Sequence, residues 1–194
     1  MRMIAMAAVL LANLVLTGGC DRGKRQEPPS VGIGQRIQVP ESDFSVVVQN
    51  GEVADSLSGN RPKAAGARWV IIKFLIKNEA AEPRDSLLEL HETLRTRSGA
   101  VYEASADGMI GLLMEDPGWS EGGLDRVPAG KEVKQVKVFP VPAEQARGEV
   151  VLVLEKWGKT GPPHAIGIAV PLTERPRTSA PAPASATGAS APSR

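Results

Sequence analysis

The chain has 194 residues, of which 23 are Lys or Arg and 22 are Asp or Glu, so its formal net charge is +1. Such a balance, with acidic residues outnumbering basic ones in the span 32–172, argues against a protein that follows a nucleic-acid backbone, and nucleic acid is not an expected partner. Because the chain has a single cysteine, no disulfide within it can support the fold, and the hydrophobic core must do so alone.

The first 19 residues have the pattern of an export signal, with Arg2, an apolar stretch over 4–16 and small residues before Cys20. That stretch is shorter than the roughly 20 residues that span a bilayer. Leu16-Thr17-Gly18-Gly19-Cys20 resembles the lipobox cut by signal peptidase II, although the usual leucine stands one place early. We therefore predict a lipoprotein signal peptide over 1–19 and lipidation of Cys20; the alternative is an ordinary secretory signal with an incidental cysteine.

This interpretation predicts where in the cell the protein is located. The chain is expected at the bacterial cell membrane, anchored by lipid and facing the periplasm or the cell exterior. A stable anchor requires more than one acyl chain, as in multiply acylated lipoproteins.

Two flanking segments have the composition of unfolded chain. Residues 20–31 are polar and include Pro28-Pro29, which indicates a short tether. Residues 173–194 consist largely of Pro, Ala, Ser and Thr, which predicts a disordered tail. The remaining span, 32–172, has the length of one domain with a real core.

Within that span the apolar residues alternate with period two, which predicts strands. The strongest strand covers 68–77, where Val70, Ile72, Phe74 and Ile76 share one face and should lie in the core. Lys73 projects to the other face, and we expect it to contribute little to stability. The eight strands expected in chain order are 35–39, 44–49, 68–77, 88–96, 101–104, 133–141, 150–155 and 166–170.

Two segments depart from simple alternation. Between residues 133 and 138 the apolar phase slips by one residue, which predicts a β-bulge. Residues 106–115 are apolar without clean helical spacing, and we expect a turn or two of helix at most. Many short strands without βαβ alternation predict an all-β fold, an immunoglobulin-like antiparallel β-sandwich, with a small barrel as the second choice.

The order of several short motifs is similar to a known family. They lie at residues 34–37, 44–48, 63–78, 98–103, 127–133 and 136–142. Together they resemble the immunoglobulin-like domain of unknown function that occurs in many bacterial lipoproteins and is akin to the mycobacterial immunoprotective extracellular protein. The resemblance implies the fold and an extracytoplasmic location and brings no catalytic residues. The chain departs from the pattern over 107–125 and in the strand after Trp157.

Residues that could carry chemistry are few. His91 and His164 are the only histidines, so a zinc or copper site lacks ligands unless folding brings them together. Five carboxylates could supply oxygens for calcium or the pair needed for glycoside cleavage, but their spacing matches no calcium loop. They are Asp107, Glu115, Asp116, Glu121 and Asp125. We expect no cofactor, no metal and no catalytic residues, and keep an envelope enzyme or metal carrier using these carboxylates as the alternative.

The long segment 108–124 suggests a contact surface, because Met and Trp are adaptable contact residues and long loops are often functional. The hypothesis is a binding site for an envelope protein partner; the alternative is that the segment only caps the core. Its residues are Met109, Leu112, Leu113, Met114 and Trp119. The function predicted from sequence is thus a non-catalytic binding or accessory module, held at the membrane by Cys20.

Overall fold

The computed structural model describes residues 30–119, 126–159 and 164–176. Its strands are β1 (Ser30–Gly32), β2 (Ile37–Gln38), β3 (Phe44–Ala54), β4 (Ala67–Asn78), β5 (Leu90–Arg95), β6 (Val101–Glu103), β7 (Glu132–Pro142), β8 (Glu149–Lys156) and β9 (Ala165–Glu174). The helices are α1 (Ser86–Glu89) and α2 (Ala106–Glu115), followed by a 3-10 turn at Pro117–Trp119. The prediction of an all-β sandwich is confirmed, and each of the eight expected strands is present.

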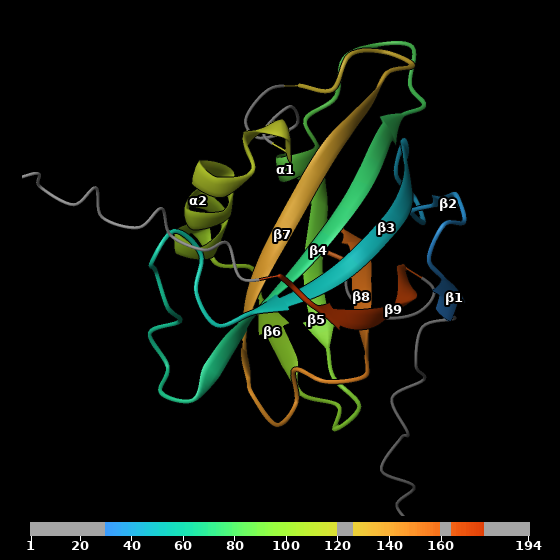
Figure 1. Cartoon of the computed structure of the whole chain (residues 1–194). Coiled ribbons are helices and arrows are strands. Elements are labelled where there is room, and N and C mark those ends of the chain that lie inside the picture. Colours follow the sequence, from blue (N-terminus) through green and yellow to red (C-terminus); the bar gives the residue numbers. More distant parts are fainter. Residues whose placement is uncertain (1–29, 120–125, 160–163, 177–194) are drawn as a thin grey trace, which may run out of the picture.

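The strands form one curled sheet in the order β6-β5-β8-β9-β3-β4-β7 (Figure 1). Strand β9 joins its two halves. It pairs antiparallel with β8 from Ala165 to Pro171, and its last residues, from Leu172 to Glu174, pair parallel with β3. The expected antiparallel sandwich thus also contains parallel pairing, because β9 crosses from one half of the sandwich to the other. A second parallel pair joins β1 to the start of β9.

The folded part is longer than the predicted 32–172 at both ends. Ser30 and Val31, placed in the tether by composition, pair with Gly167 and Ile168. At the other end β9 continues to Glu174, beyond the expected start of the tail. Residues 1–29, including the predicted signal peptide and Cys20, and residues 177–194 lie outside the described residues. No helix among those described is long and apolar enough to cross a membrane.

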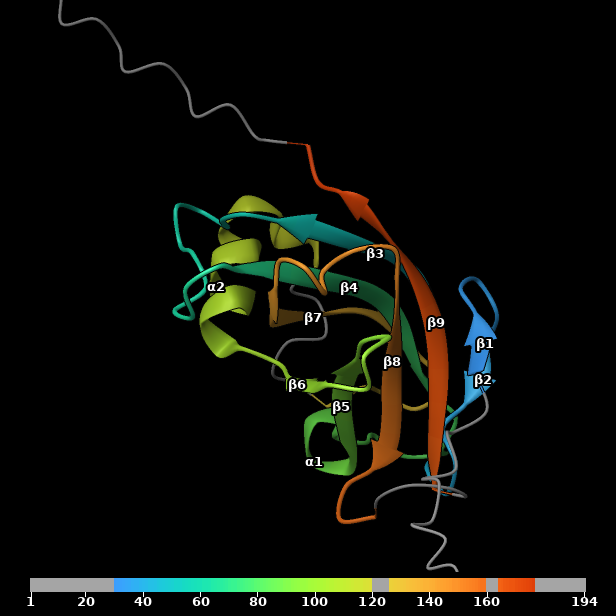
Figure 2. The same cartoon turned by 90° about the horizontal axis from the view of Figure 1, so that it is seen from below.

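The main core lies between the two halves of the curled sheet. As predicted, Val70, Ile72, Phe74 and Ile76 are fully buried there. The opposite face of β4 is also buried, which the sequence analysis did not anticipate: Trp69, Ile71 and Lys73 are covered. The reason is that α2 packs over this face of β3, β4 and β7 (Figure 2).

The predicted β-bulge in β7 is absent. The pairing of β4 with β7 is continuous from Ala67 and Pro142 to Lys77 and Glu132. The apolar phase of β7 changes because both of its faces are buried, with Val136 and Val138 on the face that α2 covers. The bulge lies in β3 instead, between Val48 and Asn50.

Candidate functional site

The segment singled out from sequence forms a regular helix, so the expectation of a turn or two was too short. Ser105 caps its N-terminus, its Oγ accepting from the Gly108 N–H at 3.4 Å. The N–H of Asp116 closes the other end by donating to the Leu112 carbonyl, and Pro117 cannot continue the helix. Sequence reasoning underestimated the length of the helix because glycines occupy part of its buried face, so the spacing of large apolar residues looked irregular.

Two of these glycines allow α2 to lie close to the sheet. A Cβ at Gly111 would stand 2.8 Å from the carbonyl oxygen of Leu57, and a Cβ at Gly108 would stand 2.6 Å from Cγ1 of Val138. Neither site has room for a side chain unless the helix moves away. The helix is thus fitted closely to a fixed place on the outer face of the β3-β4-β7 half.

The five residues predicted to contact a partner divide into three groups by their exposure. Leu112 is fully buried, so its side chain is not available to a partner, and that part of the hypothesis is corrected. Met109, Leu113 and Trp119 are half-buried and pack on a second core cluster. That cluster comprises Ala54, Leu57, Trp69, Ile71, Leu112, Val136 and Val138. Four of these five residues therefore pack on the sheet, as the capping alternative expects.

Met114 is the only one of the five that is largely exposed, at 70%. Ile110 precedes it by four residues, on the same face of the helix, and is 59% exposed. Together they make an apolar stripe on the solvent side of α2. Ile110 was not among the predicted contact residues, although an i, i+4 pattern of large apolar side chains was present in the sequence.

A buried cation lies beneath the C-terminal end of α2. The Nζ of Lys73 is 3.2 Å from Oε1 of Glu52 and 3.2 Å from Oδ2 of Asp116. It also lies 5.4 Å from the ring centroid of Trp119, within the range of a cation–π contact. Lys73 thus joins β3 and β4 to the end of the helix. Its charge is shielded from water and shared by two carboxylates, so in place of the small effect expected from sequence we now predict that removing it destabilises the fold.

The C-terminal end of the described chain joins the same network. Arg175, the residue after β9, donates from Nη1 to Oε2 of Glu52 at 2.8 Å and approaches Oε2 of Glu115 at 3.5 Å. Glu115 also accepts from the backbone N–H of Ser58. The end of α2, the loop after β3 and the end of β9 are therefore tied together by charge.

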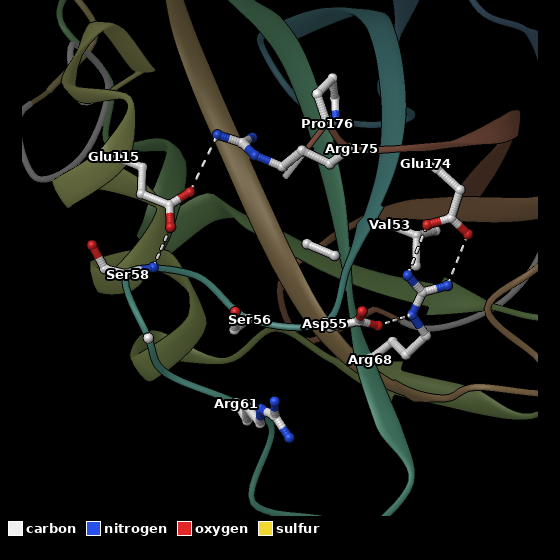
Figure 3. Close-up of a pocket in the computed structure, with 12 residues that line it drawn as sticks. Val53, Asp55, Ser56, Ser58, Arg61, Arg68, Glu115, Glu174, Arg175 and Pro176 are labelled. Atoms are coloured by element: carbon white, nitrogen blue, oxygen red, sulfur yellow. Dashed lines mark hydrogen bonds and ion pairs between the residues drawn. The ribbon is translucent and has the colours of Figure 1, made fainter. Parts of the chain in front are cut away.

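A hollow of about 690 Å³ opens beside this network, between the loop after β3, the end of α2 and residues 174–176 (Figure 3). On its other wall Arg68 donates to Asp55 at 2.7 Å and makes two bonds to Glu174, at 2.8 and 2.7 Å. The hydrogen bonds to Glu174 raise the pKa of Arg68 above its ordinary value, because their effect is larger than the opposing effect of partial burial. The long-range pairing of Arg68 with Glu174 carries no signal in the sequence.

Of the five carboxylates considered for catalysis or calcium, the three that the structure describes do not converge on one point. Asp107 pairs with Lys63 at 2.7 Å, while Glu115 and Asp116 belong to the network under α2. Glu121 and Asp125 lie outside the described residues. Within residues 30–119, 126–159 and 164–176, no three His, Cys, Asp or Glu side chains gather in a way that could hold a metal ion.

The two histidines lie in separate charged clusters. His164 is paired with Glu41. His91, on β5, lies between two carboxylates: its Nδ1 is 3.0 Å from Glu155 and its Nε2 is 3.1 Å from Glu103. When the ring is protonated both nitrogens donate, so His91 then links β5 to the strands on either side, β6 and β8.

This geometry predicts a pH dependence of stability. Burial lowers the pKa of His91, but hydrogen bonds to Glu155 and Glu103 outweigh it and leave the pKa above 6.5. Because the folded pKa is the higher one, the stabilisation is complete below pH 6.5 and is lost as the pH rises through the raised pKa. Urea denaturation at several pH values should show this loss in the wild type and in His164→Gln. The loss should be absent in His91→Gln. If the free energy of unfolding of that variant still fell with rising pH as in the wild type, His91 would not be the group responsible.

No protein-family model matches the sequence, and no curated protein matches it. Solved structures with a similar arrangement do exist. A conserved hypothetical protein of Bacillus anthracis superposes with a TM-score of 0.52 at 17% identity, over 63% of this chain and 88% of its own. An uncharacterised β-sandwich protein of Clostridium difficile gives 0.47 at 12% identity, over 76% and 97%. MPT63, a secreted protein of Mycobacterium tuberculosis, gives 0.39 at 12% identity, over 75% and 98%.

These comparisons bear on the fold alone. At 17% identity the Bacillus anthracis protein shows that the strand arrangement occurs elsewhere. The family suggested by the sequence motifs is not supported by a sequence match.

Proposed function

We propose that this chain is a lipid-anchored protein of the bacterial cell envelope whose sandwich domain is a non-catalytic binding or accessory module. The anchor is Cys20, after the small residues of the signal. The binding surface is the exposed stripe of Ile110 and Met114 on α2 with the hollow at the end of that helix. The partner is another protein of the envelope.

The observation that carries the proposal is the course of β9. Ser30, the first described residue, pairs with Gly167 near the start of β9, so the anchored end of the chain enters there. The hollow is lined by Glu174, at the far end of the same strand. Ten residues of strand span about 33 Å. The hollow and the end of α2 therefore lie at the end of the domain opposite the one at which the chain enters from Cys20.

The charged groups around the hollow support binding rather than catalysis. Glu115, Glu174 and Arg68 are each engaged in ion pairs that hold the walls together. Catalytic acids and bases instead need a pKa tuned to proton transfer and access to the substrate. The enzyme alternative would need Asp107, Glu115 or Asp116 to leave its ion pair with Lys63, Arg175 or Lys73, respectively.

The anchor is tested by Cys20→Ala. The variant should accumulate as an uncleaved precursor without lipid label, because the thiol is the acceptor of the acyl-glycerol group. Pulse labelling with a radioactive fatty acid, followed by membrane fractionation, measures both effects. Normal cleavage together with an unchanged membrane fraction would show that the chain is not anchored at Cys20.

The binding surface is tested by placing a photo-crosslinking amino acid at Met114 in living cells. The matched control is the same amino acid at Val101, which is 52% exposed and lies on β6 instead of α2. A discrete protein adduct is expected from Met114 and not from Val101. The same adduct from both positions, or none from Met114, would mean that α2 is a cover for the sheet and that any partner binds elsewhere.

A further inference from the structure

Three exposed apolar side chains gather at the end of the molecule opposite the hollow. Trp157, just after β8, is 62% exposed; Leu88 and Leu87 of α1 are 73% and 39% exposed. The two segments are joined directly, because the N–H of Trp157 donates to the carbonyl of Glu89 at 2.8 Å. The indole also meets the His91 ring edge-on, with centroids 5.1 Å apart, which fixes its place.

Strand register puts this cluster at the end where the chain enters the domain. Strand β1 runs parallel to β9 and pairs Ser30 with Gly167, so Ser30 is the residue of β1 nearest to Ala165. Ala165 is opposite Glu155, and the next residue of β8, Lys156, is opposite Leu90. Trp157 and α1 therefore lie at the end from which β1 starts, as Figure 2 shows for α1, the end of β8 and the start of β9.

We infer that Trp157, Leu87 and Leu88 dock the domain onto the surface of the bilayer that holds the lipid of Cys20. This inference rests on the proposed anchoring. Ser30 follows Cys20 by ten positions, so the domain entrance stays within about 35 Å of the lipid. For a domain tethered at that distance, the membrane surface is present at high effective concentration. The docked state is then populated even if only a few side chains insert weakly into the lipid.

The chemistry of the cluster fits the interface between lipid headgroups and acyl chains. Trp has a large apolar ring with one polar N–H, and this combination favours that depth of the bilayer. Two of the nearby cations are paired with carboxylates, Lys159 with Glu41 and Arg84 with Glu82 and Asp43, and Lys156 donates to the Glu41 carbonyl. Docking is therefore apolar, and a zwitterionic bilayer should serve as well as an anionic one.

Docking would also fix the orientation that the proposed function leaves open. A tether alone lets the domain turn in any direction. With Trp157 and α1 seated on the lipid, β9 runs away from the membrane and its end carries Arg175 and the hollow to the distal side.

The test uses the full acylated protein, extracted from membranes and reconstituted into phosphatidylcholine vesicles, with and without phospholipid brominated high on the acyl chains. Bromine quenches tryptophan only at contact range. Of the three tryptophans, Trp69 is buried and Trp119 is half-buried under α2, so quenching should come from Trp157. Flotation of the vesicles reports anchoring separately from docking.

The expected result is quenching of the wild type that disappears in Trp157→Phe and falls several-fold in Leu88→Ser. Met114→Ser, which removes an equally exposed apolar side chain at the other end, should leave it unchanged. Protein that floats with the vesicles without quenching, or quenching that persists in Trp157→Phe, would overturn docking while anchoring stands. Protein that does not float would overturn the anchoring proposal and this inference with it.

Discussion

Replacing Phe74 by alanine should lower the free energy of unfolding by about 3 to 5 kcal/mol, the range for emptying a packed aromatic site. Phe74 is fully buried at the centre of β4, among Val70, Ile72 and Ile76, and β4 is paired on both sides along its length. Because β4 is held by β3 on one side and β7 on the other, the surrounding side chains can move little to fill the cavity that the Phe74 ring would leave. Because a domain is stable by only about 5 to 15 kcal/mol, the variant loses a large share of its stability. Urea denaturation followed by circular dichroism measures it.

The matched control is Lys77→Ala on the same strand. Lys77 points to the opposite face and pairs with Glu79 at 2.6 Å, with about a third of each side chain exposed. Ion pairs at the surface contribute little to stability, so the control should unfold close to the wild type. Equal losses in the two variants would mean that Phe74 does not fill the core in solution.

The strands of this protein could be predicted because their signal is local. Alternation of apolar and polar residues needs no knowledge of the partner strand, and in β4 it identified the core face correctly at Val70, Ile72, Phe74 and Ile76. The same reasoning identified β3 and β8, where every second residue is buried in the main cluster. Fold class follows from many such strands.

The features that were not predictable depend on contacts between distant residues. Lys73 looks like a solvent-facing residue until α2, some 40 residues later, covers it and supplies Asp116. Gly108 and Gly111 read as poor helix formers, yet they are the positions that allow α2 to approach the sheet. The parallel pairing of β9 with β3 also depends on the last residues of β9 meeting residues 51–53 near the end of β3, more than 100 positions earlier in the chain.

The candidate site shows the same division. Sequence reasoning found the segment that forms α2 but could not separate the side that packs, with Leu112, from the side that is exposed, with Met114. The hollow was not foreseen, because its walls at Arg68, Glu115 and Glu174 come from three separated segments. A periodicity count that admits glycine on the buried face would have found the helix.

The second large effect is expected at an ion pair inside the main core. Glu92 lies on the inward face of β5, between the buried Leu90 and Leu94, and Lys137 lies on the inward face of β7. Lys137 Nζ is 3.1 Å from Oε2 of Glu92, and both side chains are nearly excluded from water. Burial raises the pKa of Glu92, although the neighbouring Lys137 opposes the shift.

Lys137→Met should therefore cost about 3 to 5 kcal/mol at neutral pH, because it leaves a buried carboxylate without its cation. The cost should shrink as the pH falls through the raised pKa of Glu92, since the carboxyl then enters the core uncharged. The double variant Glu92→Leu with Lys137→Met should recover the loss and reach or exceed wild-type stability, as apolar replacements of buried pairs often do. Denaturation midpoints of the single and double variants at pH 5 and pH 7 measure these differences. A double variant as unstable as Lys137→Met would show that the two charges do not act as a pair.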